Sequence, residues 1–365
     1  MSSMKTTKSL KQLSQICALL LLVSSVSGCT SLAYYSQAVS GHLALMFSGE
    51  PVEDLLADPD TPEPLRHKLQ LATEAIRFAS QQMELPAGEA FTDYVELDRP
   101  WVLVNLVVVP EFSLTPRQWC YPFAGCQAYR GFFDTGTARK EQAGYQQEGY
   151  DTFLAGVTAY STLGWFDDPL HTGFTRLPDW QMAALMFHEL AHRVLYIPGD
   201  TAFNESFATA VELEGLRLWL ISRGDTDSYL LALDRLRRLE QTRQLVDTAS
   251  ARLERLYARS DALEPEILRQ HKADIFGQLA DDYRKLTTGW AEPGPLGKDP
   301  EPLNNALLAL FRQYRQHVPA FRQLLRDSGH RFGDFYEAAR QLGEQPEQAR
   351  VEALSALAER FEEDF

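Results

Sequence analysis

The spacing of apolar and polar positions changes from a helical to a strand-like pattern along the first half of the chain. Between residues 30 and 84, apolar positions recur at the spacing of one helix face, and prolines punctuate the first part of this segment. Residues 101–109 then form a β-branched apolar run, stopped by Pro110, which is typical of a buried strand. Two shorter extended runs, at 127–133 and 152–160, predict that this strand belongs to a small sheet.

From Trp180 to the C-terminus the pattern is almost entirely helical. It is interrupted at 198–199, at 224–225 and by a Pro/Gly-rich loop at 292–297. A stripe of leucines at 230, 233, 236 and 239 favours the core of a helical bundle. The chain is therefore predicted to have an α+β fold, in which a small sheet leads into a helix pair and then into a mostly helical C-terminal half.

The first 28 residues have the layout of a secretory signal. They contain three lysines and no acid, then an apolar run from Ile16 to Val23 that is too short to span a bilayer. The following Val26-Ser27-Gly28-Cys29 resembles the bacterial lipobox, which implies that Cys29 is acylated and becomes the mature N-terminus. The alternative is an ordinary signal peptide with an incidental cysteine. Because Thr30 rather than aspartate follows, the resemblance points to the outer membrane, with the protein facing the periplasm.

This interpretation divides the chain into a signal peptide, 1–28, and a single domain, 29–365. Within that domain we expect a helical lead-in (29–100), the sheet and the candidate metal site (101–222), and a helical bundle (223–365).

The cysteines of the mature chain then form one pair. Cys17 leaves with the signal and Cys29 carries lipid, so Cys120 and Cys126 remain, in an oxidising compartment. We expect them to form a disulfide; two free thiols are the alternative.

The charge balance limits the classes of partner. Loss of residues 1–28 removes three lysines and changes the net charge from −15 to −18. Nucleic acid is then excluded as a partner by charge. Because an acidic surface is repelled by anionic head groups, membrane attachment is expected through acyl chains at the N-terminus.

The segment His188-Glu189-Leu190-Ala191-His192 has the spacing of a zinc-binding helix. Residues four apart lie on one face, so His188 and His192 can bind one metal ion. Glu189 lies beside them and can accept a proton from the attacking water without occupying a coordination position. Two histidines and a glutamate on an apolar helix with no metal would be buried polar groups without partners.

The third ligand decides the class of zinc site. A metzincin would have glycine and histidine where this chain has Leu195 and Pro198. Residues 203–208, Phe-Asn-Glu-Ser-Phe-Ala, instead resemble the Asn-Glu-x-Phe-Ala stretch of the aminopeptidase branch of the gluzincins. The resemblance implies that Glu205 is the third ligand of one Zn²⁺ per chain and that Glu212 supports the site from the same helical face. Only twelve residues separate His192 from Glu205, fewer than in alanyl aminopeptidases, so a tight turn must connect the two helices.

The combination resembles, over essentially the whole chain, a family of bacterial lipoproteins described as putative aminopeptidases. The segments that carry the resemblance are 119–126, 129–131, 159–169 and 187–208. It implies a zinc metallopeptidase with a peptide substrate. It supports peptidase activity better than it supports specificity for the N-termini of peptides.

Other residues are assigned around this site by chemical type. The extended segment that includes Thr158 and Ala159 is expected to hold substrate backbone by strand addition, although an ordinary buried strand is the alternative. Asp167 and Asp168 could bind a free ammonium group, or could simply form a turn before Pro169. We expect Tyr160 to be the oxyanion donor. The other candidates for this role are Tyr129, Tyr196 and His171.

Three functions are consistent with these residues. The first is an aminopeptidase of the cell envelope and the second is an envelope endopeptidase. The third is a catalytically silent lipoprotein that uses zinc structurally and binds a partner. Glu189 favours an enzyme, because a closed structural site has no use for a free carboxylate beside its ligands.

Overall fold

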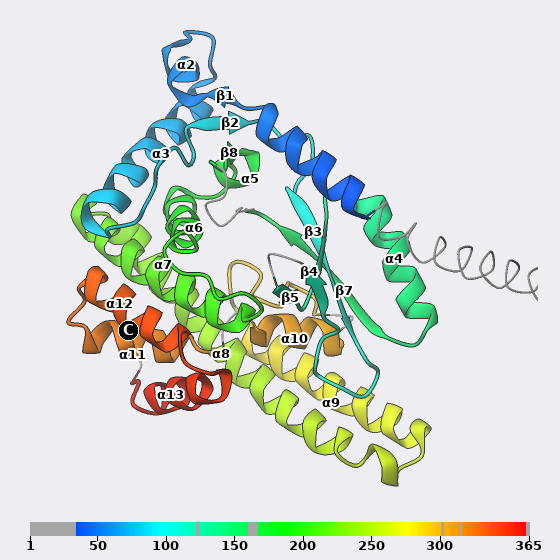
Figure 1. The fold of residues 1–365 in the computed structure, drawn as a ribbon. Helices are drawn as coiled ribbons and strands as arrows, with labels where there is room; N and C mark the ends of the chain where they lie inside the picture. The colour runs from blue at the N-terminus through cyan, green and yellow to red at the C-terminus, as the bar shows by residue number, and fades with distance from the viewer. Residues whose placement is uncertain (1–33, 122–124, 160–166, 301–302, 314–315, 363–365) are drawn as a thin grey trace, which may run out of the picture.

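The computed structural model describes residues 34–121, 125–159, 167–300, 303–313 and 316–362, and these form an α+β fold (Figure 1). The predicted fold class is confirmed, because short sheets lie in the first half and the second half is helical. Among the described residues, no helix is long and apolar enough to cross a membrane. Cys29 and Tyr160 lie outside the described residues.

The first third of the chain wraps the molecule with helices and a minor sheet. A helix of residues 34–47, called here the N-terminal helix, is followed by α2 (Val52–Ala57) and α3 (Glu63–Gln82). The minor sheet contains β1 (Glu50–Pro51) antiparallel to β2 (Asp93–Val95), and β2 is parallel to β8 (Leu170–His171).

The main sheet has the predicted apolar strand in its centre. This strand, β3 (Leu103–Val109), is buried along its whole length and pairs antiparallel with β6 (Arg130–Phe132) and β7 (Asp151–Val157). In the order β6-β3-β7, the strand β7 therefore lies at an edge. A helix, α4 (Thr135–Gln147), connects β6 to β7.

The prediction of one extended run over 127–133 was wrong. β5 (Gly125–Gln127) pairs with β4 (Trp119–Tyr121) in a separate hairpin, and β6 starts only at Arg130. Because the two strands join different partners, the chain must turn between them.

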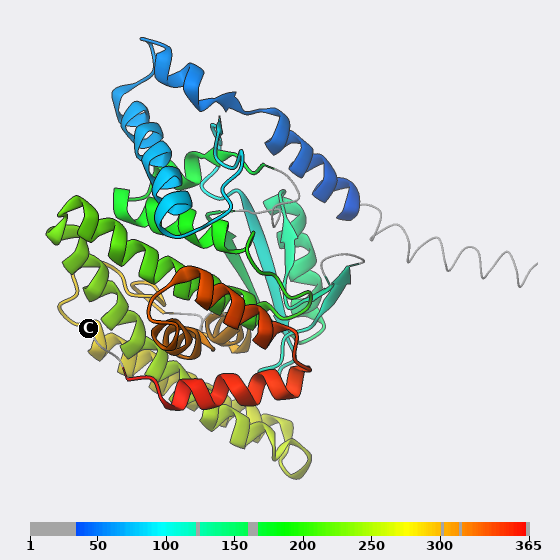
Figure 2. The same cartoon turned by 60° about the vertical axis from the view of Figure 1, so that its left-hand side comes forward.

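The remaining chain is helical. After a short α5 (Thr172–Thr175), the helices α6 (Asp179–Ala191) and α7 (Thr201–Arg223) pack against each other in the left half of Figure 1. The later helices, with a 3₁₀ turn at Ser260–Ala262, are α8 (Thr226–Tyr257), α9 (Pro265–Leu286), α10 (Asn305–Gln313), α11 (Val318–Asp327), α12 (Phe332–Gly343) and α13 (Glu347–Glu359). Figure 2 shows α11, α12 and α13 grouped against α7 and α8.

The helical half is joined to the main sheet through a partly buried carboxylate. Asp151, at the start of β7, accepts hydrogen bonds from Lys272 Nζ of α9 at 2.7 Å and from the backbone NH of Asn305 at 2.9 Å. This bridge connects the long α8–α9 hairpin to the strand that leads towards the candidate site.

The predicted leucine stripe of α8 does not form a closed core. Leu233, Leu236 and Leu239 line a cavity, and Leu230 is 58% exposed. The helical spacing was correct, but the neighbouring helices leave space in front of this face.

Candidate metal centre

Helix α6 positions the two histidines and Glu189, and its apolar side chains anchor it in the core. Pro178 stands at its N-cap, where the missing NH costs nothing, and Met182, Met186 and Phe187 are fully buried. His188 and Glu189 lie in the last turn, and His192 is the residue that caps the helix. The two imidazole rings are 4.9 Å apart, centre to centre.

A short turn without helix brings α7 back to these histidines, as the twelve-residue spacing predicted. The Asn204 side chain stabilises this turn with two hydrogen bonds to Ile197. Its Oδ1 accepts from the Ile197 NH and its Nδ2 donates to the Ile197 carbonyl, each at 2.8 Å. Asp200 caps α7 by accepting from the Phe203 NH at 3.0 Å, and it forms an ion pair with Arg350 at 2.8 Å. Asn204 therefore fixes the position of the next residue, Glu205.

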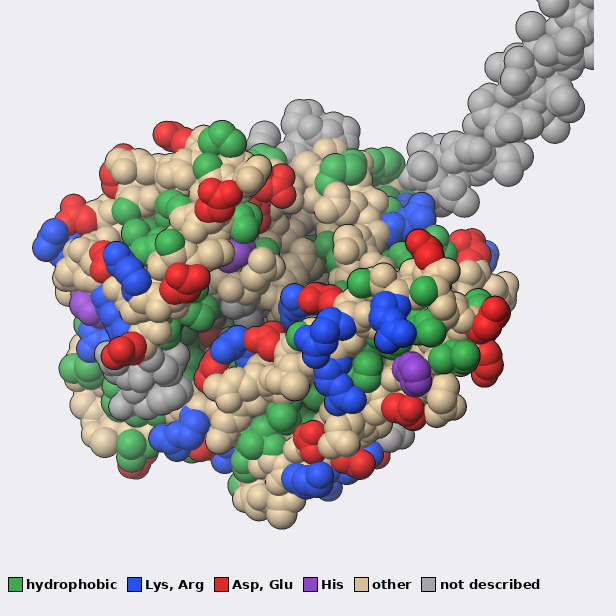
Figure 3. All heavy atoms as spheres, turned by 90° about the horizontal axis from the view of Figure 1, so that it is seen from below, with side chains coloured by type: hydrophobic (Ala, Val, Ile, Leu, Met, Phe, Trp, Pro, Cys, Tyr) green, Lys and Arg blue, Asp and Glu red, His purple; other side chains and the backbone are tan. Residues whose placement is uncertain are grey.

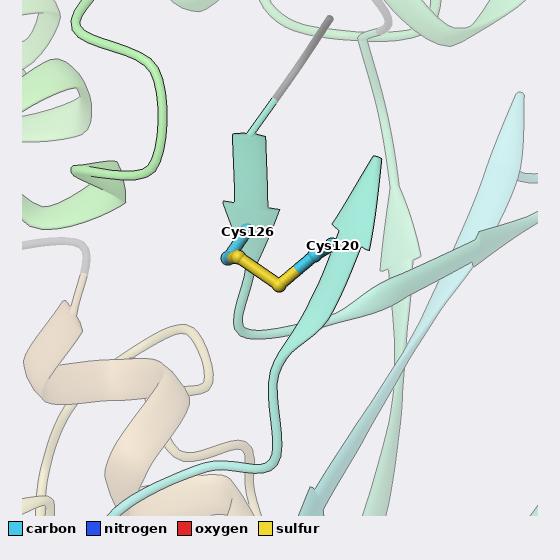
Figure 4. Close-up of a disulfide and its surroundings, with 2 residues drawn as sticks. All are labelled: Cys120 and Cys126. Atoms are coloured by element: carbon cyan, nitrogen blue, oxygen red, sulfur yellow. A yellow bond between two sulfur atoms is a disulfide. The ribbon is translucent and has the colours of Figure 1, made fainter. Parts of the chain in front are cut away.

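The disulfide hairpin packs against the same turn. Cys120 and Cys126 are bonded across β4 and β5, which confirms the predicted pair (Figure 4). A Cβ atom added to Gly125 would lie 2.8 Å from the backbone nitrogen of Gly199. Gln127 of the hairpin donates to the Tyr196 hydroxyl at 2.9 Å. The hairpin thus contacts the turn backbone to backbone.

Three side chains converge between α6 and α7. Ligand atoms of His188, His192 and Glu205 all lie within 4.8 Å of one another. His188 Nε2 is 3.3 Å from one Glu205 oxygen, and His192 Nε2 is 4.0 Å from the other. Tetrahedral zinc with ligands at about 2.0–2.2 Å separates them by about 3.3–3.5 Å, so the donor set fits one zinc ion after a small closure.

The fourth residue, Glu212, supports this group from behind. One of its oxygens lies 3.1 Å from His188 Nδ1, the nitrogen that faces away from Glu205. A carboxylate in this position fixes the tautomer and the orientation of a ligand histidine. His192 Nδ1 has no hydrogen-bond partner among the described residues.

Burial and mutual charge shift every titratable group of the cluster. Burial lowers the pKa of His188, but hydrogen bonds to Glu205 and Glu212 outweigh it and hold the pKa well above its usual value. Burial lowers the pKa of His192 to about 4 and raises the pKa of Glu189 to about 7. Despite burial, the hydrogen bond to His188 lowers the pKa of Glu205. Without metal, Glu205 and Glu212 thus favour the protonated form of His188, which lies between them.

Two of the candidate oxyanion donors lie within electrostatic reach of the site. Burial, then Glu205 and Glu189 among other groups, raise the pKa of the Tyr129 phenol. Burial and Glu205 also raise the pKa of Tyr196. His171 is instead fully buried and caps α5, where its Nδ1 accepts from the Gly173 NH at 3.1 Å. Both phenols are therefore influenced by the charge of Glu205, and that of Tyr129 also by the charge of Glu189.

The candidate substrate residues lie in different environments. Asp167 is half-exposed and forms an ion pair with Arg193 at 3.5 Å. Asp168 is buried, and its charge acts on Glu189. Thr158 and Ala159 follow the edge strand β7, and Ala159 is packed in the main core. Their roles in substrate binding stay predictions.

A cavity of about 400 Å³ lies between α6, α7, α8 and α11, next to Glu212, and its walls combine leucine side chains with four arginines and two glutamates. Thr158 and Glu212 belong to its lining, so the cavity reaches both the end of the edge strand and the carboxylate behind His188. Sequence reasoning missed this cavity, because leucines that line a space have the same helical spacing as leucines in a core.

Comparison with known proteins gives one match. Residues 33–354 match the model of a protein family described as "Putative aminopeptidase". No curated protein and no solved structure matches the chain.

Proposed function

Because the chain belongs to the putative aminopeptidase family, we propose that it is a zinc-dependent peptidase that removes residues from the N-termini of peptides. The observation that carries this proposal is the convergence of His188, His192 and Glu205, with Glu189 on the same helix turn as the two histidines.

The residues of the cluster divide the chemistry between them. When bound, zinc supplies Lewis acidity that polarises the scissile carbonyl and makes water a better nucleophile. Glu189 accepts a proton from the attacking water and passes it to the leaving amine. Tyr129 is our candidate donor for the developing oxyanion among the described residues, because the charges of Glu205 and Glu189 both act on its phenol.

The edge strand and the cavity suggest how a peptide binds. Among the described strands β7 pairs on one side only, although its Thr152 carbonyl accepts from Asn304, and an extended peptide can add to such an edge by backbone hydrogen bonds. The cavity that begins at Thr158 can accept an apolar side chain against its leucines, which are the most frequent residue type in a lining that also contains arginines and glutamates. We therefore infer a preference for peptides with a large apolar residue near the scissile bond.

Internal cleavage is a second candidate function. An aminopeptidase must bind a free ammonium group, and one of the two acids considered for this, Asp167, is already paired with Arg193. An endopeptidase does not need that contact. The remaining proposals are that the enzyme is anchored by lipid on Cys29 and faces the periplasm at the outer membrane.

Digestion of a peptide mixture by the purified protein separates the two activities. Loss of residues from free N-termini supports the aminopeptidase, and new internal ends support the endopeptidase. Products with apolar residues enriched at the cleaved bond would support the role given to the cavity. If no bond is cut at any zinc concentration, the enzymatic proposal is wrong.

Two substitutions distinguish the proposed proton acceptor, Glu189, from the proposed metal ligand, Glu205. Glu189→Gln keeps the shape but removes the proton acceptor, so hydrolysis should fall by about 10²–10⁴-fold while zinc content stays near one ion per chain. Glu205→Gln should instead weaken zinc binding, because a neutral amide is a poor ligand. Elemental analysis beside peptidase assays measures both; full activity of Glu189→Gln would refute its role.

A further inference from the structure

The N-terminal helix (residues 34–47) is fixed to the body through one face. The Tyr34 hydroxyl lies 3.1 Å from that of Tyr121, and Gln37 Oε1 accepts from the Phe133 NH at 3.1 Å. Leu45 is buried in an apolar cluster with strand residues, and Gly41 lies against the ring of Phe133. These four residues have helical spacing, so they hold the helix in a defined rotation.

The opposite face of this helix is apolar and exposed. Tyr35, Val39, Leu43 and Phe47, each four residues apart, are 44%, 56%, 43% and 83% exposed. They form a continuous stripe along the outer side, because residues four apart lie above one another. Figures 1 and 2 both show the helix at the margin of the molecule. We call these four residues the outer stripe.

Charge is absent from the same segment. From residue 34 to residue 49 the chain has no Asp, Glu, Lys or Arg, although the protein carries 85 such residues in total. Elsewhere, acidic and basic side chains are interspersed on the surface, as the face in Figure 3 shows. In a protein of net charge −15, the N-terminal helix is thus a region that an apolar, uncharged partner can approach without desolvating a charge.

We propose that the outer stripe rests on the surface of a lipid bilayer and acts as a second membrane contact. Cys29, the predicted acylation site, lies five residues before Tyr34. Even when fully extended, five residues span at most about 18 Å, so acyl chains on Cys29 keep the start of the helix close to the membrane. A helix with an apolar outer face beside this anchor adds buried apolar area to the attachment.

The chemistry predicts a particular lipid dependence. The segment has no basic residue, so binding should depend on burial of the outer stripe and not on anionic lipid. Association should therefore occur on neutral phosphatidylethanolamine/phosphatidylcholine vesicles and should persist in high salt. A rigid helix held by Tyr34, Gln37, Gly41 and Leu45 would also fix the orientation of the protein relative to the bilayer.

A polarity-sensitive fluorophore tests this contact in the full chain. Phe47→Cys and Leu43→Cys place the fluorophore on the outer stripe, and Leu230→Cys, which is 58% exposed on α8, is the matched control. The parent chain, treated in the same way, reports any labelling at its own cysteines. With neutral vesicles, the emission at 43 and 47 should shift to shorter wavelength at low and at high salt, whereas the emission at 230 should not.

Other outcomes would overturn the proposal. Emission at 43 and 47 that stays water-like on membrane-bound protein would mean that the stripe faces solvent. A shift that needs no vesicles and rises with protein concentration would identify a second copy of the chain as the partner. A shift seen only with anionic lipid and lost in salt would show electrostatic binding by another surface.

Vesicle flotation adds a second measurement. In the Cys29→Ser chain, whose attachment does not include acyl chains, serine at positions 39, 43 and 47 together should lower the vesicle-bound fraction at least about tenfold, because burial of each large apolar side chain contributes severalfold to partition. Serine at 230 and at the similarly exposed Ile221 should leave the bound fraction unchanged. Equal binding of all these variants would refute the contact.

Discussion

At the scale of single residues, two glutamates of α7 show how position decides role. Glu212 contacts His188 Nδ1, whereas Glu214, two residues on, is buried and binds Arg217 and His330. Both acids line the same cavity, yet only Glu212 touches a candidate ligand.

This difference predicts the metal affinity of two variants. Glu212→Gln should weaken zinc binding about 10–100-fold, because the ligand histidine loses the carboxylate that orients it. Glu214→Gln should leave zinc affinity unchanged, although it loses charge-assisted hydrogen bonds. Competition with a chromophoric zinc chelator measures both. Equal losses in the two variants would show that Glu212 acts only through general stability.

His171 gives a prediction about pH. Burial lowers its pKa from 6.5 to about 4, so the folded protein holds this ring neutral while the unfolded chain protonates it near pH 6.5. Its contribution to stability is therefore complete above pH 6.5 and is lost as the pH falls towards 4. The loss should be on the order of 3 kcal/mol.

His171→Asn should flatten this dependence, because asparagine keeps an acceptor at the α5 N-cap but does not titrate in this range. Urea unfolding at several pH values between about 7 and about 4 measures how steeply the free energy of unfolding depends on pH. His271→Asn, an exposed position on α9, is the control and should keep the slope of the parent. An unchanged slope in His171→Asn would assign the acid sensitivity to other groups.

At the scale of elements, the disulfide hairpin and the α6–α7 turn behave as one unit. Gly125 has a φ of +71° and touches the backbone at Gly199, whereas Gly149 has a φ of +83° and has nothing within 4 Å of an added Cβ. Alanine substitutions at these two glycines therefore distinguish the free-energy cost of a left-handed backbone from the cost of a steric clash with the turn.

Alanine at both positions should therefore have unequal effects. Gly149→Ala should lose about 1–2 kcal/mol of unfolding free energy, the cost of a left-handed conformation for a residue with a Cβ. Gly125→Ala should lose more, and it should also lower zinc affinity, because the turn that positions Glu205 must move away from the hairpin. Denaturant unfolding and zinc titration of both variants test this, and identical effects would mean that the hairpin does not brace the turn.

At the scale of the whole molecule, the N-terminus is expected to determine location. Cys29→Ser should release the protein from the membrane fraction or leave it unprocessed, because acyl chains are the proposed anchor. Fractionation and the mass of the mature chain measure the two outcomes. The outer stripe alone should give weaker, partial association, so normal processing with complete membrane retention would argue against acylation at Cys29.

The sequence by itself determined those features that depend on local spacing. The four-position spacing of His188 and His192 places both imidazoles on one helix face, and Pro178 set where that helix begins. The β-branched run at 103–109 became a fully buried strand, and the cysteine pair closed a six-residue separation as a disulfide. Each of these follows from backbone geometry or from a short covalent loop, which neighbours in the sequence specify.

Only the tertiary structure decided features that join distant segments. It brought Tyr129 within the electrostatic influence of Glu205 and Glu189, paired Asp167 with Arg193, and set the hairpin glycine against the turn at Gly199. It also made three leucines of α8 line a cavity and left the stripe of the N-terminal helix uncovered. Helical spacing identifies an apolar face but does not say what packs against it. That depends on how elements separated by many residues meet, which the pattern of a single segment does not contain.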